Sequence, residues 1–124
     1  ALANLLRELQ ERDLLDSTIV VCGGEFGRTP QINVTGGRDH WPTGFSMLVA
    51  GGPFRRGHVH GETSADPKLD EADKLVDVHQ PITVQQLHAS LLDALGIDFQ
   101  KELLTPIGRP LVLSEGSVVR ELFA

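Results

Sequence analysis

The sequence lacks the short motifs that mark most hydrolytic and phosphate-binding sites. It has no nucleophile elbow G-x-S-x-G, no phosphate loop G-x-x-x-x-G-K-[ST], no dinucleotide fingerprint G-x-G-x-x-G and no zinc motif H-E-x-x-H. No serine or threonine stands in a pattern that would activate it as a nucleophile. These absences argue against covalent catalysis by the 124 residues alone.

Cysteine and long apolar runs are equally scarce. The single Cys22 excludes an intramolecular disulfide and a thiolate metal cage, and its place among valines predicts a small buried side chain. The longest apolar run covers only a handful of residues, so the sequence predicts no transmembrane helix. The formal net charge of −6 argues against nucleic acid or an anionic membrane surface as a partner.

Hydrophobic periodicity predicts the helices and strands. Leu2, Leu5, Leu6 and Leu9 share one face of a helix, and residues 18–22 are apolar on both faces, as a buried parallel strand would be. We further expect a long loop at residues 23–44, a strand at 45–50, a helix from Thr83 that ends before Gly96, and a short strand at 111–113.

A helix followed by a buried strand is half of a βαβ unit, so the sequence predicts an α/β fold. We expect residues 1–124 to form a single α/β domain with a mainly parallel sheet flanked by helices. Two strong strands do not make a stable sheet of this kind. Because the chain also opens inside a helix and without Met, we expect it to be the C-terminal piece of a longer protein that supplies the missing strands.

The first candidate site residues follow the predicted strand at residues 18–22. In open α/β sheets the loops after strand ends gather ligands, and Glu25 lies just past such an end. Its carboxylate is either a ligand for a divalent cation or a surface acid. Arg28 has a planar fork suited to a phosphate or sulfate oxyanion, but it could equally brace the loop by pairing with Glu25 or Asp39.

The second group lies in "GRDHWP". The imidazole of His40 could bind a metal, with Asp39 as a further ligand or as the acceptor that orients the ring. Trp41 is either a packed wall or a surface on which a sugar ring stacks. The candidate metal ligands are therefore Glu25, Asp39 and His40.

The chain resembles the C-terminal part of a bacterial family known as domain of unknown function 1501, which is grouped with the alkaline phosphatase and sulfatase superfamily. The similarity lies in "TIVVCGGEFGRTPQIN", "GRDHWPTGFSMLVAGGPFRRGHVHGET", "PITVQQLHASLLDALGID" and "TPIGRPLVLSEGSVVRELFA". These stretches cover nearly the whole chain, and the "GEFGRTP" and "GRDHWP" blocks are the specific ones.

The resemblance implies an alkaline-phosphatase-like fold of which this chain is the C-terminal section. It implies that Glu25 takes the place of a metal-binding Asp and His40 that of a later metal-binding histidine. Phe26 stands where the superfamily has a second histidine ligand, and phenylalanine cannot coordinate a metal. The superfamily's nucleophile and its remaining metal ligands belong to the first half of the domain and have no counterpart here.

We therefore expect part of a metal-dependent phosphate- or sulfate-ester hydrolase, with Arg28 as the catalytic and substrate-binding cation and Trp41 as a second substrate contact. The expected cofactor is a divalent Zn, Ca, Mg or Mn ion, and the expected substrate is a small anionic ester or a sulfated or phosphorylated saccharide. The alternative is a non-catalytic descendant that binds a ligand or a partner, or a chain that self-associates through an exposed sheet edge. The family implies an exported or periplasmic location for the longer protein.

Overall fold

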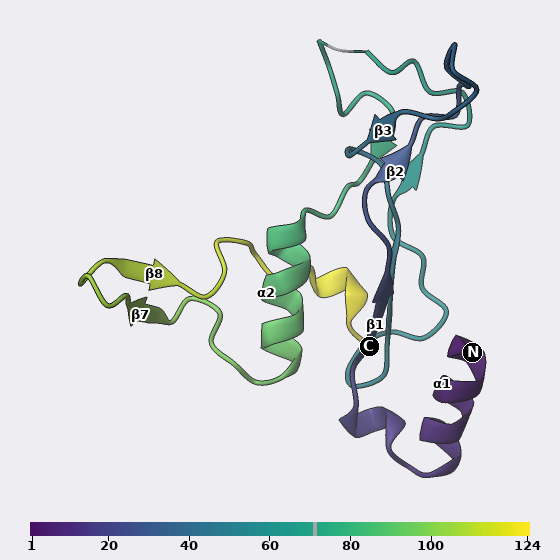
Figure 1. Cartoon of the computed structure of the whole chain (residues 1–124). Helices are drawn as coiled ribbons and strands as arrows, with labels where there is room; N and C mark the ends of the chain where they lie inside the picture. The colour runs from purple at the N-terminus through teal and green to yellow at the C-terminus, as the bar shows by residue number, and fades with distance from the viewer. Residues whose placement is uncertain (71) are drawn as a thin grey trace. The chain divides into compact units, whose positions relative to one another are not determined.

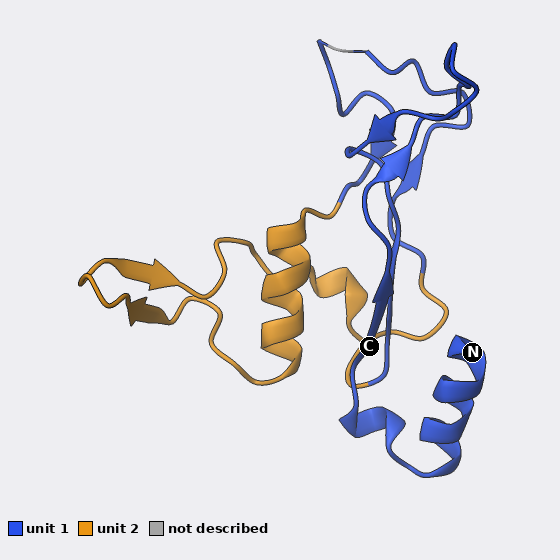
Figure 2. Cartoon of the chain, in the orientation of Figure 1, with its two compact units in different colours: residues 1–51, 59–81 blue, residues 52–58, 82–124 orange. Residues whose placement is uncertain are grey.

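The structure, a computed structural model, describes residues 1–70 and 72–124. The chain forms two compact units, which are described separately (Figure 2). Unit 1 comprises residues 1–51 and 59–81, and unit 2 comprises residues 52–58 and 82–124. The strands that the structure describes form four separate antiparallel pairs, β1–β4, β2–β3, β5–β6 and β7–β8 (Figure 1).

Unit 1 begins with the predicted amphipathic helix, which is confirmed as α1. Its apolar stripe stays half-buried or exposed, while Arg7 and Arg12 form ion pairs with Glu11 and Glu8 on the polar side. The elements of unit 1 are α1 (Leu2–Glu11), the short 3₁₀ helix η1 (Leu15–Ser17), and the strands β1 (Val20–Gly23), β2 (Gly27–Arg28), β3 (His40–Trp41), β4 (Met47–Ala50), β5 (Glu62–Thr63) and β6 (Val78–His79).

The prediction of an α/β fold with a mainly parallel, alkaline-phosphatase-like sheet is wrong. β1 runs antiparallel to β4, with Val20 opposite Ala50 and Gly23 opposite Met47. The chain returns from β1 to β4 through a loop that contains only the short β2–β3 pair, and a parallel pair would need a crossover connection, usually a helix. Apolar residues on both faces of β1 favoured a buried strand, but a lone pair covers neither face, and Cys22 is exposed.

A buried carboxylate organises the second half of unit 1. Asp77 is only 3% exposed, and its two carboxylate oxygens accept the backbone N–H groups of Lys68 (2.9 Å) and Leu69 (2.7 Å). Its own carbonyl accepts the N–H of Ser64 at 2.8 Å. Leu69 has a positive φ of 55°, which turns two successive amides toward the same side chain. Asp77 therefore closes the loop between β5 and β6.

Unit 2 is built on α2 (Val84–Ala94), whose ends the sequence predicted correctly. Thr83 is the N-cap and forms a capping box with Gln86, which satisfies two otherwise unpaired amides of the first turn. Gly96 follows the helix with φ +72°, a conformation that glycine adopts without a steric cost. The other elements of unit 2 are β7 (Glu102–Leu104), β8 (Pro110–Val112) and the 3₁₀ helix η2 (Arg120–Leu122).

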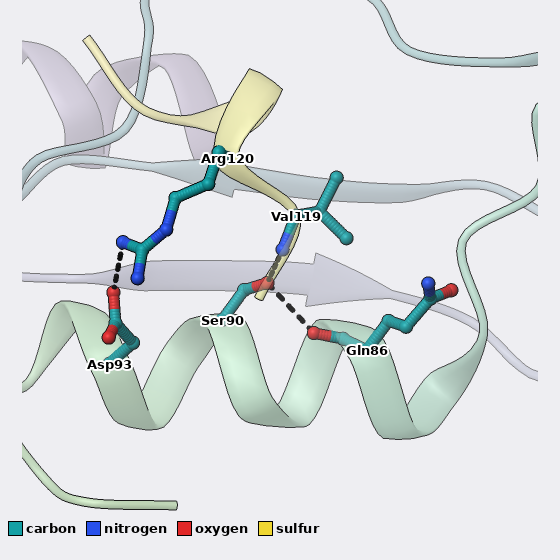
Figure 3. A network of polar contacts seen from close by, with 5 residues as sticks. All are labelled: Gln86, Ser90, Asp93, Val119 and Arg120. Atoms are coloured by element: carbon teal, nitrogen blue, oxygen red, sulfur yellow. Dashed lines mark hydrogen bonds and ion pairs between the residues drawn. The ribbon is translucent and has the colours of Figure 1, made fainter. Parts of the chain in front are cut away.

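The core of unit 2 joins α2 to the C-terminal segment (Figure 3). Ser90 is fully buried; its hydroxyl donates to the Gln86 carbonyl at 2.8 Å and accepts the Val119 N–H at 3.0 Å. Next to it, Arg120 pairs with Asp93 at 2.8 Å. The apolar partners in this unit are Ala89, Val119 and Phe54, and the Phe54 ring lies 5.1 Å from that of Phe123.

Within the described parts of both units, neither helix has the length and apolar character that crossing a bilayer requires.

Candidate functional site: the β2–β3 ribbon

The predicted site residues gather on the short β2–β3 ribbon of unit 1. Arg28 lies directly opposite His40, and Gly27 lies opposite Trp41. Gly27 is required here because a Cβ atom at this position would overlap the backbone carbonyl oxygen of Gly44. The strand therefore approaches the neighbouring loop closely, and the register between β2 and β3 places Arg28 beside His40.

One face of the ribbon carries a cation and two rings. Side chains alternate between the faces of a strand, so Phe26, Arg28 and His40 share a face. The Phe26 and His40 ring centroids lie 4.4 Å apart, and the Arg28 guanidinium carbon lies 5.5 Å from the Phe26 centroid. Phe26 thus contacts both polar members of this face through its ring.

Glu25 binds directly to the cation of this face. One of its carboxylate oxygens accepts a hydrogen bond from an Arg28 terminal nitrogen at 2.5 Å. The Glu25 side chain is 64% exposed and that of Arg28 is 45% exposed. Water therefore screens the ion pair, and it contributes about 0–1 kcal/mol to stability. The pairing of Arg28 with Glu25, one of the two arrangements expected from the sequence, is the one that forms.

Asp39 and Trp41 lie on the opposite face of the ribbon. The backbone of Asp39 extends the pairing by one step, since its carbonyl accepts the Thr29 N–H at 2.9 Å and its N–H donates to the Thr29 hydroxyl at 3.1 Å. A methyl group at Gly44 would lie 3.0 Å from the Trp41 ring, so the indole covers this buried glycine. The Trp41 indole therefore packs on Gly44, on the face away from His40.

Asn33 has a structural role in this loop that was not predicted from the sequence. Its side-chain oxygen accepts hydrogen bonds from the N–H of Thr35 (3.0 Å), the hydroxyl of Thr35 (2.7 Å) and the N–H of Gly37 (3.0 Å). Its side-chain nitrogen donates to Asp39 at 2.8 Å. The sequence feature that indicates this role is an asparagine shortly before Gly36 and Gly37, because asparagine side chains accept hydrogen bonds from the backbone of turns. Asn33 thus orients the Asp39 carboxylate.

Arg38 fixes the start of the same loop. Its guanidinium donates to the carbonyl oxygens of Thr29 at 3.0 Å and Pro30 at 2.8 Å. Both arginines of the loop are exposed. The Arg38 guanidinium bonds to backbone carbonyl oxygens, whereas that of Arg28 bonds to the Glu25 side chain.

The candidate metal ligands are divided between the two faces. Glu25 and His40 belong to the Arg28 face, whereas Asp39 points away and accepts a bond from Asn33. A carboxylate oxygen and an imidazole nitrogen are of the ligand types that a divalent cation such as zinc takes, and in this structure the Glu25 carboxylate is bonded to Arg28. Among residues 1–70 and 72–124, no group of three or more His, Cys, Asp or Glu side chains is arranged to hold a metal ion.

The protein is thus built from short antiparallel strand pairs. One of them, the β2–β3 ribbon, carries Arg28 paired with Glu25, and His40 in contact with the Phe26 ring. The chain belongs to the family described as protein of unknown function (DUF1501), whose sequence profile matches residues 1–123. Neither the curated proteins nor the solved structures contain a match to the chain.

Proposed function

We propose that the β2–β3 ribbon is the anion-binding part of a phosphate- or sulfate-ester hydrolase, completed by other segments of a longer protein. The observation that supports this proposal is the single face shared by Arg28, His40 and Phe26, with Glu25 bonded to Arg28. The likeness to alkaline phosphatases and sulfatases concerns these residues only. It does not concern the strands, which pair antiparallel.

Arg28 binds the anionic group of the substrate. A guanidinium donates two parallel hydrogen bonds to phosphate or sulfate oxygens, which fixes the orientation of the group and neutralises its charge. Glu25 holds the guanidinium before an anion arrives, and the exposure of both side chains leaves the pair open to exchange. The incoming oxyanion therefore competes with the carboxylate of Glu25.

Glu25 and His40 are the residues of this chain that would hold a divalent cation. The bound cation would supply Lewis-acid polarisation of the ester oxygen. Phe26 restricts the His40 ring by direct contact, with the two centroids 4.4 Å apart, and so limits the directions in which the imidazole nitrogens point. The remaining ligands and the nucleophile come from outside these residues.

A second function is favoured by one specific observation. Phe26 occupies the position of an expected ligand and packs on His40, while Glu25 is already neutralised by Arg28. A face of this kind suits a non-catalytic protein that binds an anionic or phosphorylated ligand without a metal. The two functions share the anion site at Arg28 and differ in whether Glu25 and His40 bind a metal.

The anion site is tested by titrating the chain with inorganic phosphate and sulfate and following backbone and side-chain NMR shifts. We expect shifts at Arg28 and its strand neighbours, loss of these shifts in Arg28→Gln, and retention in the control Arg7→Gln, which removes an exposed arginine of α1. We expect Glu25→Gln to bind the anion more tightly, because the competing carboxylate charge is gone.

Shifts that persist unchanged in Arg28→Gln would show that the anion binds elsewhere and would refute the proposal. Titration with Zn²⁺ or Mn²⁺ then separates the two functions. Loss of metal binding in both Glu25→Gln and His40→Phe supports the hydrolase, whereas metal binding that neither variant changes, or that the native chain lacks, supports the non-catalytic ligand-binding protein.

A further inference from the structure

The β7–β8 hairpin of unit 2 carries apolar side chains that stay exposed among the residues that the structure describes. Leu103 and Leu104 of β7 are 47% and 76% exposed, Leu111 of β8 is 59% exposed, and Ile107 at the turn is 87% exposed. In Figure 1 the hairpin extends away from α2, the helix of the same unit. A two-stranded hairpin is marginally stable on its own, and a third or fourth strand adds the needed burial.

The hydrogen bonds inside the hairpin fix which backbone groups are left over. The Thr105 N–H donates to the Arg109 carbonyl at 2.9 Å, and the Leu113 N–H donates to the Lys101 carbonyl at 3.2 Å. Bonded pairs alternate along antiparallel strands, so Leu103, midway between them, also bonds inward to β8. Its two neighbours in β7 direct their N–H and C=O groups outward.

The two edges of the hairpin differ in their capacity to pair. On the β8 edge the outward residues include Pro110, which has no N–H and therefore blunts that edge. On the β7 edge Glu102 and Leu104 each present a donor and an acceptor. In the part of the chain that the structure describes, no backbone group outside the hairpin bonds to them. β7 is the open edge.

We propose that the β7 edge binds a second copy of this chain, forming a four-stranded antiparallel sheet around a two-fold axis at Leu103. In this pairing Glu102 of one copy exchanges two hydrogen bonds with Leu104 of the other, and the symmetry repeats the exchange. The hairpin thereby gains the additional strands that it lacks.

The side chains of the edge are complementary to themselves in this register. Leu103 meets Leu103 of the second copy across the axis, and the Leu111 side chains, directly opposite on β8, extend the same apolar face. Glu102 lies opposite Leu104, so no two like charges are placed directly across from each other, an arrangement that would destabilise the pair. A second copy of β7 therefore fits the edge without a charge conflict.

The size of the hairpin sets the expected strength. Stable interfaces bury about 800 Å² per partner, and two strands of three residues each supply less than this area. We therefore expect a weak, reversible dimer that forms as the protein concentration rises.

Sedimentation velocity over a series of concentrations tests the proposal. We expect Leu103→Lys and Leu103→Glu each to raise the dimer dissociation constant by about tenfold or more, because each places like charges across the axis. The control Ile107→Lys adds the same charge at an equally apolar, more exposed position outside the edge, and we expect it to leave the dimer intact.

A mixture of the two Leu103 variants provides the decisive measurement. We expect Leu103→Lys and Leu103→Glu to form a heterodimer when combined, which also shows that both variants are folded. Three results would overturn the proposal: a chain that stays monomeric at every concentration, self-association that survives both single variants, or a mixture that does not restore it.

Discussion

Replacing Ser90 by alanine should weaken the junction between α2 and the C-terminal segment (Figure 3). The Ser90 hydroxyl is fully buried and accepts the Val119 N–H at 3.0 Å, and Val119 itself is only 8% exposed. Alanine removes the acceptor and leaves a buried N–H without a partner.

The expected magnitude follows from two opposing terms. An unsatisfied buried N–H costs about 1–3 kcal/mol. Alanine has the higher helix propensity and returns up to about 0.7 kcal/mol in mid-helix. The other bond of Ser90, to the Gln86 carbonyl at 2.8 Å, adds little, since that carbonyl lies in the helical ladder of α2. The cost of the lost acceptor is larger than the gain in helix propensity, and we expect a net destabilisation of about 1–2 kcal/mol.

Amide hydrogen exchange followed by NMR measures this change where it occurs. A loss of about 1.4 kcal/mol corresponds to about tenfold faster exchange of the Val119 amide. Urea unfolding monitored by circular dichroism should show a matching shift. Ser17→Ala is the control, because the Ser17 hydroxyl bonds to Leu14 on the exposed surface, and we expect a change within about 0.5 kcal/mol. Unchanged Val119 protection in Ser90→Ala, with an unfolding free energy equal to that of Ser17→Ala, would refute the reasoning.

Two further substitutions test the packing of each unit. Gly116→Ala should destabilise unit 2 by about 1–3 kcal/mol in urea unfolding, since the new Cβ atom would overlap the Gln85 backbone. Gly24→Ala is the neutral control, because a Cβ atom at Gly24 would have no atom within 4 Å. Equal stability of the two variants would contradict this packing. Asp77→Asn retains one accepting oxygen for the two backbone amides at residues 68–69, so hydrogen exchange of at least one of these amides should become faster. Unchanged exchange rates at both amides would contradict the role of Asp77 in closing the loop of unit 1.

The helices could be predicted because their determinants are local. The leucine spacing of α1, the cap at Thr83 and the stop at Gly96 are all read within a few residues of the helix. The short strand near residues 111–113 was also expected, and it forms as β8. In each case the residues that decide the structure are neighbours along the chain.

The candidate site was predictable in part. Glu25 and Arg28 are three residues apart, and their pairing was one of the stated alternatives. The side of the ribbon to which His40 and Asp39 point could not be predicted, because it depends on the register between β2 and β3. A shift of one residue in that register would exchange the two faces.

By itself, the sequence determined helices α1 and α2, the cap and stop of α2, and the identity of the charged residues in the loop after β1. The direction of strand pairing was decided only by the tertiary structure: residues 18–22 are equally apolar on both faces, and such a run fits a parallel or an antiparallel neighbour. The same holds for the ribbon, where the pairing of Arg28 with His40 brings together side chains that are twelve positions apart. Local patterns encode helices because their hydrogen bonds join near neighbours, whereas strand partners and the faces of a site are set by contacts between distant residues.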